Sequence, residues 1–139
     1  MGDLQSQETS NPCSISQYAA LAALRGPQEC VETMRREFAR RRDYVTKRIA
    51  SLPDVTCAPM QGAFYAFINI SRHLGKRYGG VLVENSSQWC LELLAQKGVA
   101  TVMGSAFGAE GYARLSFATS MENLAAALDR IDEFLRDAK

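Results

Sequence analysis

Strict alternation along residues 112–118 is the feature that most limits how this chain can fold. In an extended strand, successive side chains point to opposite faces. The three apolar side chains before Ala118 fall on one face: Ala113, Leu115 and Phe117. The three polar ones fall on the other: Tyr112, Arg114 and Ser116. The segment therefore predicts a β-strand with one face in a hydrophobic core and an arginine at the middle of its second face.

The chemistry of Arg114 is open to two interpretations. Its guanidinium is a planar fork of donors that matches a carboxylate in a bidentate manner and stays charged at physiological pH, which favours a carboxylate receptor. An arginine on a solvated sheet face produces the same pattern. The strand alone does not separate the two.

Helical periodicity and turn residues predict the other elements. Helices are expected over residues 13–24, 28–51, 86–97 and 120–137, and strands over 55–58 and 63–70 and at two places within 99–118. The strand at 63–70 is apolar on both faces, which suits a central strand covered on each side. Residues 71–84 are expected to form a loop. This order predicts an α+β domain: a small, partly antiparallel sheet of about four strands with helices packed largely on one face.

Composition excludes several classes of function. The chain is 47% hydrophobic and 22% charged with a net charge of +1, so no nucleic-acid partner is expected. The helix expected over residues 28–51 is rich in arginine, but acidic residues are interleaved at pairing distances, such as Glu37–Arg41. This pattern indicates a solvated face and not a nucleic-acid-binding one. No apolar run is long enough to span a membrane, and no membrane partner is expected. The four cysteines are scattered and only His73 accompanies them, so we expect no metal site and a cytoplasmic location.

Four segments, in order, are similar to parts of one enzyme family. They are residues 10–17 (SNPCSISQ), 59–65 (PMQGAFY), 99–108 (VATVMGSAFG) and 112–124 (YARLSFATSMENL). Together they resemble the C-terminal small domain of bacterial aspartate aminotransferases, which belong to the pyridoxal-phosphate-dependent fold-type I class. The resemblance covers nearly the whole chain. Met103 departs from it, because the family usually has proline at this position.

The resemblance implies roles for individual residues. Arg114 would bind the α-carboxylate of an amino acid substrate. The residues implied to line the substrate side of the domain are Gly62, Phe64 and Tyr65. Those implied to lie at a dimer boundary are Ser10 and Asn11. The whole enzyme would be a homodimer that transfers an amino group between an L-amino acid and a 2-oxo acid.

The cofactor-binding lysine of the family is not recognisable here. None of the four lysines has the family's Ser-x-x-Lys setting: Lys47, Lys76, Lys97 and Lys139. The resemblance therefore implies a missing N-terminal large domain, with residues 1–10 as an extended lead-in from it and residues 11–139 as the small domain. Alone, the chain is expected to lack catalytic residues, to bind no pyridoxal phosphate and to be inactive. The alternative is a stand-alone module that binds a carboxylate ligand or a protein without catalysis.

Overall fold

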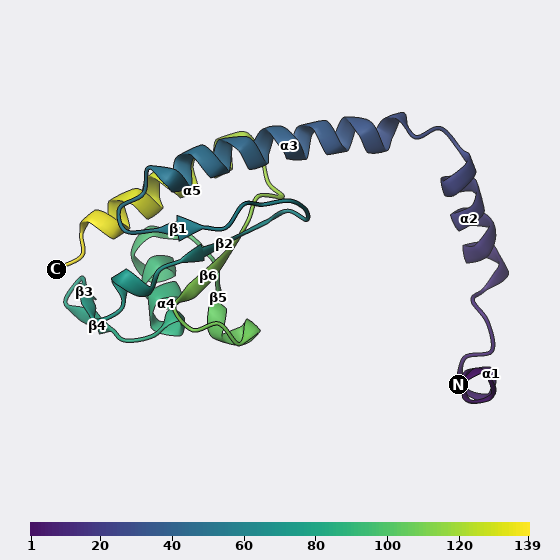
Figure 1. Ribbon diagram of the computed structural model, residues 1–139, viewed down its shortest axis with the longest axis horizontal. Helices are drawn as coiled ribbons and strands as arrows, with labels where there is room; N and C mark the ends of the chain where they lie inside the picture. Colours follow the sequence, from purple (N-terminus) through teal and green to yellow (C-terminus); the bar gives the residue numbers. More distant parts are fainter. The chain divides into compact units, whose positions relative to one another are not determined.

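The computed structural model describes all 139 residues, which divide into two compact units, Met1–Arg35 and Arg36–Lys139 (Figure 1). The first unit contains α1 (Gly2–Glu8), α2 (Ser14–Arg25) and the start of α3 (Glu29–Ala50). None of its residues is buried, and the apolar side chains of Ile15, Tyr18 and Leu24 are 78%, 75% and 81% exposed. No helix of the chain is long and apolar enough to cross a membrane.

The extended conformation expected for residues 1–10 is wrong for most of them, because Gly2–Glu8 forms α1. Gln5 donates its backbone N–H to the carbonyl of Met1 at 3.1 Å, and Thr9 donates to Gln5 at 2.9 Å. Local hydrogen bonds between residues four apart define this helix in a segment that has no apolar periodicity. That residues 1–10 lead in from a preceding domain stays a prediction.

The helical periodicity of residues 28–51 predicts one apolar face along this helix, and the structure buries only part of that face in α3. Val45 and Ile49 are each 2% exposed, whereas Val31 and Met34 are 57% and 60% exposed. The opposite face is solvated as its charge pattern predicts, with Arg41 paired to Glu37 at 2.9 Å. Only the C-terminal part of the apolar face therefore contributes to a core.

The second unit is built on a four-stranded sheet in the order β1-β2-β6-β5, and all its neighbouring strands are antiparallel rather than partly so. Its strands are β1 (Thr56–Cys57), β2 (Tyr65–Asn69), β5 (Val102–Met103) and β6 (Tyr112–Ser116). The strand expected at 63–70 is central, but it is not covered on each side. Ala66 and Ile68 on one face are fully buried, whereas Tyr65 and Phe67 on the other are half-buried.

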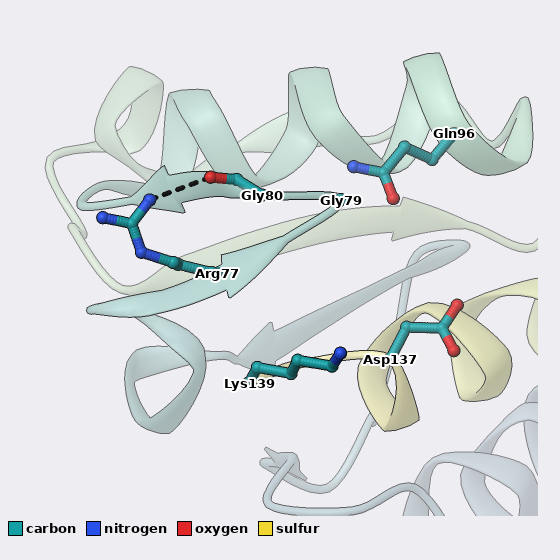
Figure 2. Close-up of a pocket in the computed structure, with 6 residues that line it drawn as sticks. All are labelled: Arg77, Gly79, Gly80, Gln96, Asp137 and Lys139. Atoms are coloured by element: carbon teal, nitrogen blue, oxygen red, sulfur yellow. Dashed lines mark hydrogen bonds between the residues drawn. The ribbon is translucent and has the colours of Figure 1, made fainter.

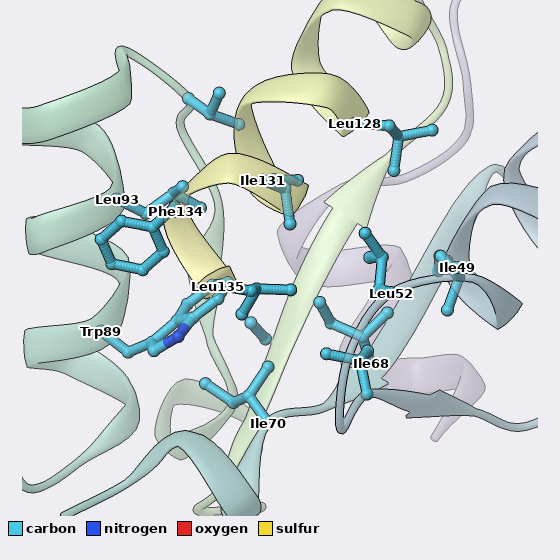
Figure 3. Close-up of a cluster of buried hydrophobic side chains, with 14 of the residues drawn as sticks. Ile49, Leu52, Ile68, Ile70, Trp89, Leu93, Leu128, Ile131, Phe134 and Leu135 are labelled. Atoms are coloured by element: carbon cyan, nitrogen blue, oxygen red, sulfur yellow. The ribbon is translucent and has the colours of Figure 1, made fainter. Parts of the chain in front are cut away.

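Helices supply the rest of the core on the buried face of the sheet, which confirms the predicted α+β class. Figure 3 shows side chains from α3, β2, α4 (Ser86–Lys97) and α5 (Met121–Arg136) converging there. The labelled members are Ile49, Leu52, Ile68, Ile70, Trp89, Leu93, Leu128, Ile131, Phe134 and Leu135. Asn85 caps α4 by accepting from Gln88 N–H, and Ser120 caps α5 by accepting from Asn123 N–H. Because α3, α4 and α5 supply their buried residues to the same core, they leave the second face of the sheet uncovered.

The loop expected over residues 71–84 is instead ordered structure. It contains a short 3₁₀ helix, η1 (Ser71–His73), and a hairpin of β3 (Lys76–Tyr78) and β4 (Val81–Val83). Gly79 and Gly80 join the strands with φ of +55° and +90°. A two-residue turn of this kind needs positive φ at its centre, so the Gly-Gly pair was the hairpin signal that the loop interpretation overlooked.

His73 ties this region to the turn before β1. Its side chain is 1% exposed, and Nε2 lies 2.9 Å from the Pro53 carbonyl while Nδ1 lies 2.7 Å from the Tyr78 hydroxyl. A carbonyl only accepts, so Nε2 carries the proton and Nδ1 accepts from Tyr78. Burial lowers the pKa of His73 and raises the pKa of Tyr78 to about 12. The neutral imidazole is thus the form that this site stabilises.

We expect the free energy of unfolding to fall as the pH drops below about 6.5, the pKa of an unfolded histidine. Below that pH the unfolded chain binds a proton at His73, whereas the folded chain does not. The free energy of unfolding therefore falls by at most about 1.4 kcal/mol per pH unit, until the pH reaches the lowered pKa of His73 in the folded chain. This pH dependence of the free energy of unfolding is measured by urea unfolding of the wild-type chain and of His73→Gln at about pH 7.5 and about pH 5.5. The wild type should lose more stability than the variant between the two pH values; equal losses would contradict the prediction.

Candidate functional site

The second face of the sheet gathers polar and aromatic side chains from β2 and β6. The antiparallel register places Phe67 opposite Arg114, Tyr65 opposite Ser116 and Asn69 opposite Tyr112. On the core side, Ala66, Ile68 and Ala113 are fully buried and Leu115 is partly buried. The alternation predicted for β6 is therefore confirmed, and Arg114 lies at the middle of the face that the helices leave open.

The guanidinium of Arg114 is held by aromatic rings and by no acid. Its central carbon lies 4.3 Å from the ring centre of Tyr65 and 4.6 Å from that of Phe107. These are cation–π distances. Tyr65 belongs to β2, one neighbour of β6, and Phe107 ends the 3₁₀ helix η2 (Gly104–Phe107) that follows β5, the other neighbour. Arg114 forms neither a hydrogen bond nor an ion pair within the chain, so its donors are free for a ligand.

More rings surround this contact. Phe67 stacks on Tyr112, with ring centres 5.0 Å apart and planes 15° apart, and meets Phe107 edge-on at 6.0 Å. Phe64 lies beside Tyr65 at 4.5 Å. An arginine within an apolar aromatic surround interacts more strongly with an anion than one in open water, because the local dielectric is lower. The arrangement can therefore bind a carboxylate.

The structure brings some of the predicted site residues together. Arg114 and Tyr65 are in contact, and Phe64 adjoins Tyr65. Gly62 precedes β2 without a close neighbour, since nothing lies within 4 Å of the position that a Cβ would occupy. The left-handed residue of its turn is Ala63, with φ of +57°. The substrate-lining role of Gly62 stays a prediction.

Ser10 and Asn11, the predicted dimer-boundary residues, belong to the first unit and are exposed. Ser10 has φ of +55° and donates its hydroxyl to the Ser6 carbonyl at 3.4 Å. Their proposed place beside a second subunit stays a prediction.

Phe107 is the residue of this face that the sequence reasoning did not single out. It stands one position before Gly108, which has φ of +69°, at the end of a short turn between two strands. A large aromatic residue in a glycine-punctuated turn was an available signal. Its contact with Arg114 depends on the pairing of β5 with β6, which was not assigned from the sequence.

A surface hollow lies away from this face. Figure 2 shows it between the β3–β4 turn, α4 and the end of α5, with a volume of about 480 Å³. Its lining residues are Arg77, Gly79, Gly80, Gln96, Asp137 and Lys139. Arg77 donates to the Gly80 carbonyl at 2.8 Å, and Asp137 pairs with Lys97 at 3.2 Å. The hollow contains no residue of β2 or β6, so we place the candidate site at Arg114 instead.

None of the four lysines lies on the elements that carry the Arg114 face. Lys47 is on α3 and Lys139 ends the chain. Lys76 on β3 pairs with Asp54 at 3.6 Å, and Lys97 at the end of α4 pairs with Glu133 at 3.3 Å. No group of three His, Cys, Asp or Glu side chains is placed to hold a metal ion. The residues present do not fit a lysine-bound cofactor.

Comparison with known proteins assigns the family. The sequence pattern of the aminotransferase class I and II family matches residues 1–131. The chain belongs to this family. It is 47% identical over 135 residues to the aspartate/prephenate aminotransferase of Cereibacter sphaeroides, covering 96% of the chain and 34% of that protein. It is 44% identical over 135 residues to the aspartate aminotransferase of Geobacillus stearothermophilus, covering 97% of the chain and 33% of that protein.

Solved structures agree with this assignment. The fold resembles the crystal structure of the aspartate aminotransferase from Rhizobium meliloti with a TM-score of 0.90 and 39% identity, over 98% of this chain and 34% of that one. The predicted family resemblance and the predicted α+β fold are thus confirmed. This aminotransferase-family chain spans about a third of the length of the relatives that it matches.

Proposed function

We propose that the chain is the C-terminal substrate-binding domain of a pyridoxal-phosphate-dependent, aspartate-type aminotransferase. The complete enzyme transfers an amino group between an L-amino acid and a 2-oxo acid in the cytoplasm. The observation that carries this proposal is the guanidinium of Arg114, which lies between two rings with no acid beside it. The family match and the names of the relatives support it.

In this proposal Arg114 binds the α-carboxylate through two parallel hydrogen bonds. A bidentate pair fixes the orientation of the carboxylate as well as its position, which a single point charge cannot do. Tyr65 and Phe64 form the apolar wall beside it, and Gly62 lies in the turn that leads into this wall. The chain's contribution to the reaction is to bind and orient the substrate.

The chemistry that pyridoxal phosphate would supply in the complete protein is an electron sink at the α-carbon of the substrate. The lysines of this chain lie away from Arg114, so the cofactor must be held by another part of the complete protein. We propose that an N-terminal large domain provides that part, that residues 1–10 lead in from it and that residues 11–139 form the small domain.

The exposed apolar side chains of the first unit fit this proposal. Ile15, Tyr18 and Leu24 on α2 are more exposed than is usual for large apolar residues. We propose that the large domain and the second subunit of a homodimer cover these side chains, with Ser10 and Asn11 at the boundary between subunits.

The proposal is tested by comparing the isolated chain with the complete protein. We expect the chain alone to show no stoichiometric pyridoxal-phosphate absorption and no aminotransferase activity, because no lysine adjoins its carboxylate site. The complete protein should show both. Absorption titration and a coupled assay with aspartate and a 2-oxo acid measure this. Saturable binding of one cofactor per isolated chain would contradict the proposed division of roles, and an inactive complete protein that binds the cofactor would contradict the proposed reaction.

A further inference from the structure

Phe107 is a large apolar side chain that the fold holds at the surface. Its ring is 48% exposed, yet it lies 4.6 Å from the Arg114 guanidinium carbon and 6.0 Å from the Phe67 ring centre. It contributes nothing to the buried core. Both of these contacts are with side chains of the face that carries Arg114.

The turn that carries Phe107 is closed by tight backbone packing. A Cβ added at Gly104 would lie 2.2 Å from the Ala109 carbonyl oxygen and 2.6 Å from that of Tyr112. Only glycine fits this approach without a backbone shift. Ala109 also donates its N–H to the Gly104 carbonyl at 3.0 Å. The two ends of the turn are therefore locked together beneath Phe107.

A carboxylate fixes the same turn to the start of α4. Glu110 accepts from the backbone N–H of Ser86 at 2.6 Å and from that of Gly111 at 3.0 Å. Ser86 is fully buried, and its hydroxyl accepts from Ser105 N–H at 3.4 Å. These backbone donors lower the pKa of Glu110. Negative charge at a helix N-terminus is also favoured by the helix dipole. The turn is thus anchored to a buried part of the second unit.

We propose that Phe107 is a positioning residue for Arg114, and that its ring, on a turn anchored by Glu110, fixes the plane of the guanidinium before a substrate carboxylate arrives. A ring against the flat face of a guanidinium leaves the N–H donors at its edge free. A donor fork that is already oriented loses less conformational freedom on binding. This inference rests on the proposed function, because it assumes that Arg114 binds the substrate carboxylate.

The test uses two variants of the complete protein. Phe107→Leu keeps an apolar side chain but removes the aromatic ring, whereas Phe107→Tyr keeps an aromatic ring. We expect Phe107→Leu to raise KM for the amino acid, and the competitive inhibition constant of propionate, by about 3- to 30-fold. kcat should fall less than KM rises, because the carboxylate contact itself is retained. Phe107→Tyr should remain within about twofold of the wild type in both constants.

Tyr44→Leu is the matched control. The Arg48 guanidinium carbon lies 5.8 Å from the Tyr44 ring centre on α3, so the variant removes a cation–π contact away from the site, together with the hydrogen bond that Arg48 donates to the Tyr44 hydroxyl at 2.9 Å. It should leave KM and the propionate constant unchanged. Wild-type values of both constants for Phe107→Leu would overturn the inference, as would an equal change in the Tyr44 control.

A double-mutant cycle tests the anchor. Glu110→Gln keeps the shape of the side chain but weakens its charge-assisted hydrogen bonds, and should raise KM by about two- to fivefold. In a Phe107→Leu background the same change should have little further effect, since the ring it positions is gone. Full additivity would overturn the role of the anchor. If Arg114 variants themselves keep normal KM, the proposed function fails; if only the Phe107 and Glu110 variants do, the positioning inference alone fails.

Discussion

Arg114→Lys in the complete enzyme should lower kcat/KM by about 30- to 1,000-fold. Removing one partner of a close, charge-assisted contact costs on the order of 2–4 kcal/mol, although the substitution keeps the formal charge. Lysine places a point charge on a flexible stem and cannot form the two parallel bonds of a guanidinium. It also loses the planar contacts with Tyr65 and Phe107 at 4.3 and 4.6 Å.

Turnover should fall together with affinity, because the same contact orients the substrate. Arg114→Leu should lose more, since the substrate carboxylate would then face an apolar surface without a partner. Steady-state kinetics measure both variants, with circular dichroism to check folding. Arg72→Lys is the control, because Arg72 is exposed and contacts only Asp54, at 3.5 Å. If both Arg114 variants fold and keep a near-normal kcat/KM, Arg114 is a solvated residue of the sheet face and not a carboxylate receptor.

Phe134→Ala should destabilise the isolated chain by about 3–5 kcal/mol, the usual cost of removing a buried phenylalanine. Phe134 on α5 is fully buried, stacks on Tyr78 at 4.2 Å and meets Trp89 edge-on at 5.7 Å. Removing it breaks two ring contacts and leaves a cavity where α4, α5 and the β3–β4 hairpin meet. The loss is a large fraction of the 5–15 kcal/mol or so that stabilises an ordinary domain.

Urea unfolding followed by fluorescence reports on this site directly, because Trp89 is the single tryptophan and contacts Phe134. We expect one cooperative transition, shifted to lower urea in the variant. Phe107→Ala is the matched control: its ring is 48% exposed, so its loss should cost no more than about 1 kcal/mol. Similar losses for the two variants would show that Phe134 does not hold the core together.

The parts of the fold that the sequence predicted well are those with a strong local period. The alternation around Arg114 predicted which face of β6 is buried, and the apolar spacing on α5 predicted its burial through Leu128 and Ile131. The parts that were wrong had other causes. Gly79 and Gly80 were interpreted as loop residues although their pairing marks a tight hairpin. Residues 2–8 form a helix through local hydrogen bonds that leave no apolar pattern.

The candidate site was predictable to the extent that it depends on one strand. Arg114 was identified from β6 alone, whereas Tyr65 lies on β2 and Phe107 on η2 after β5, and the pairing of β2 and β5 with β6 is a long-range property. Tyr65 was named only through the family resemblance, and Phe107 was missed. A residue's own strand predicts the face on which it lies; the residues beside it depend on strand order and register, which the periodicity of a single segment does not specify.

The register of β2 against β6 has a further consequence for a chain in which these two strands are paired incorrectly. Ala113 and Leu115 occupy the core side of the same five-residue strand that presents Arg114 on the other. A slip of one residue would turn the guanidinium into the hydrocarbon interior and expose alanine in its place. A misaligned chain would therefore be less stable than the correctly paired one, and its guanidinium would not be on the open face. The pairing of β2 with β6 therefore determines both the stability of the core and the presence of Arg114 on the open face.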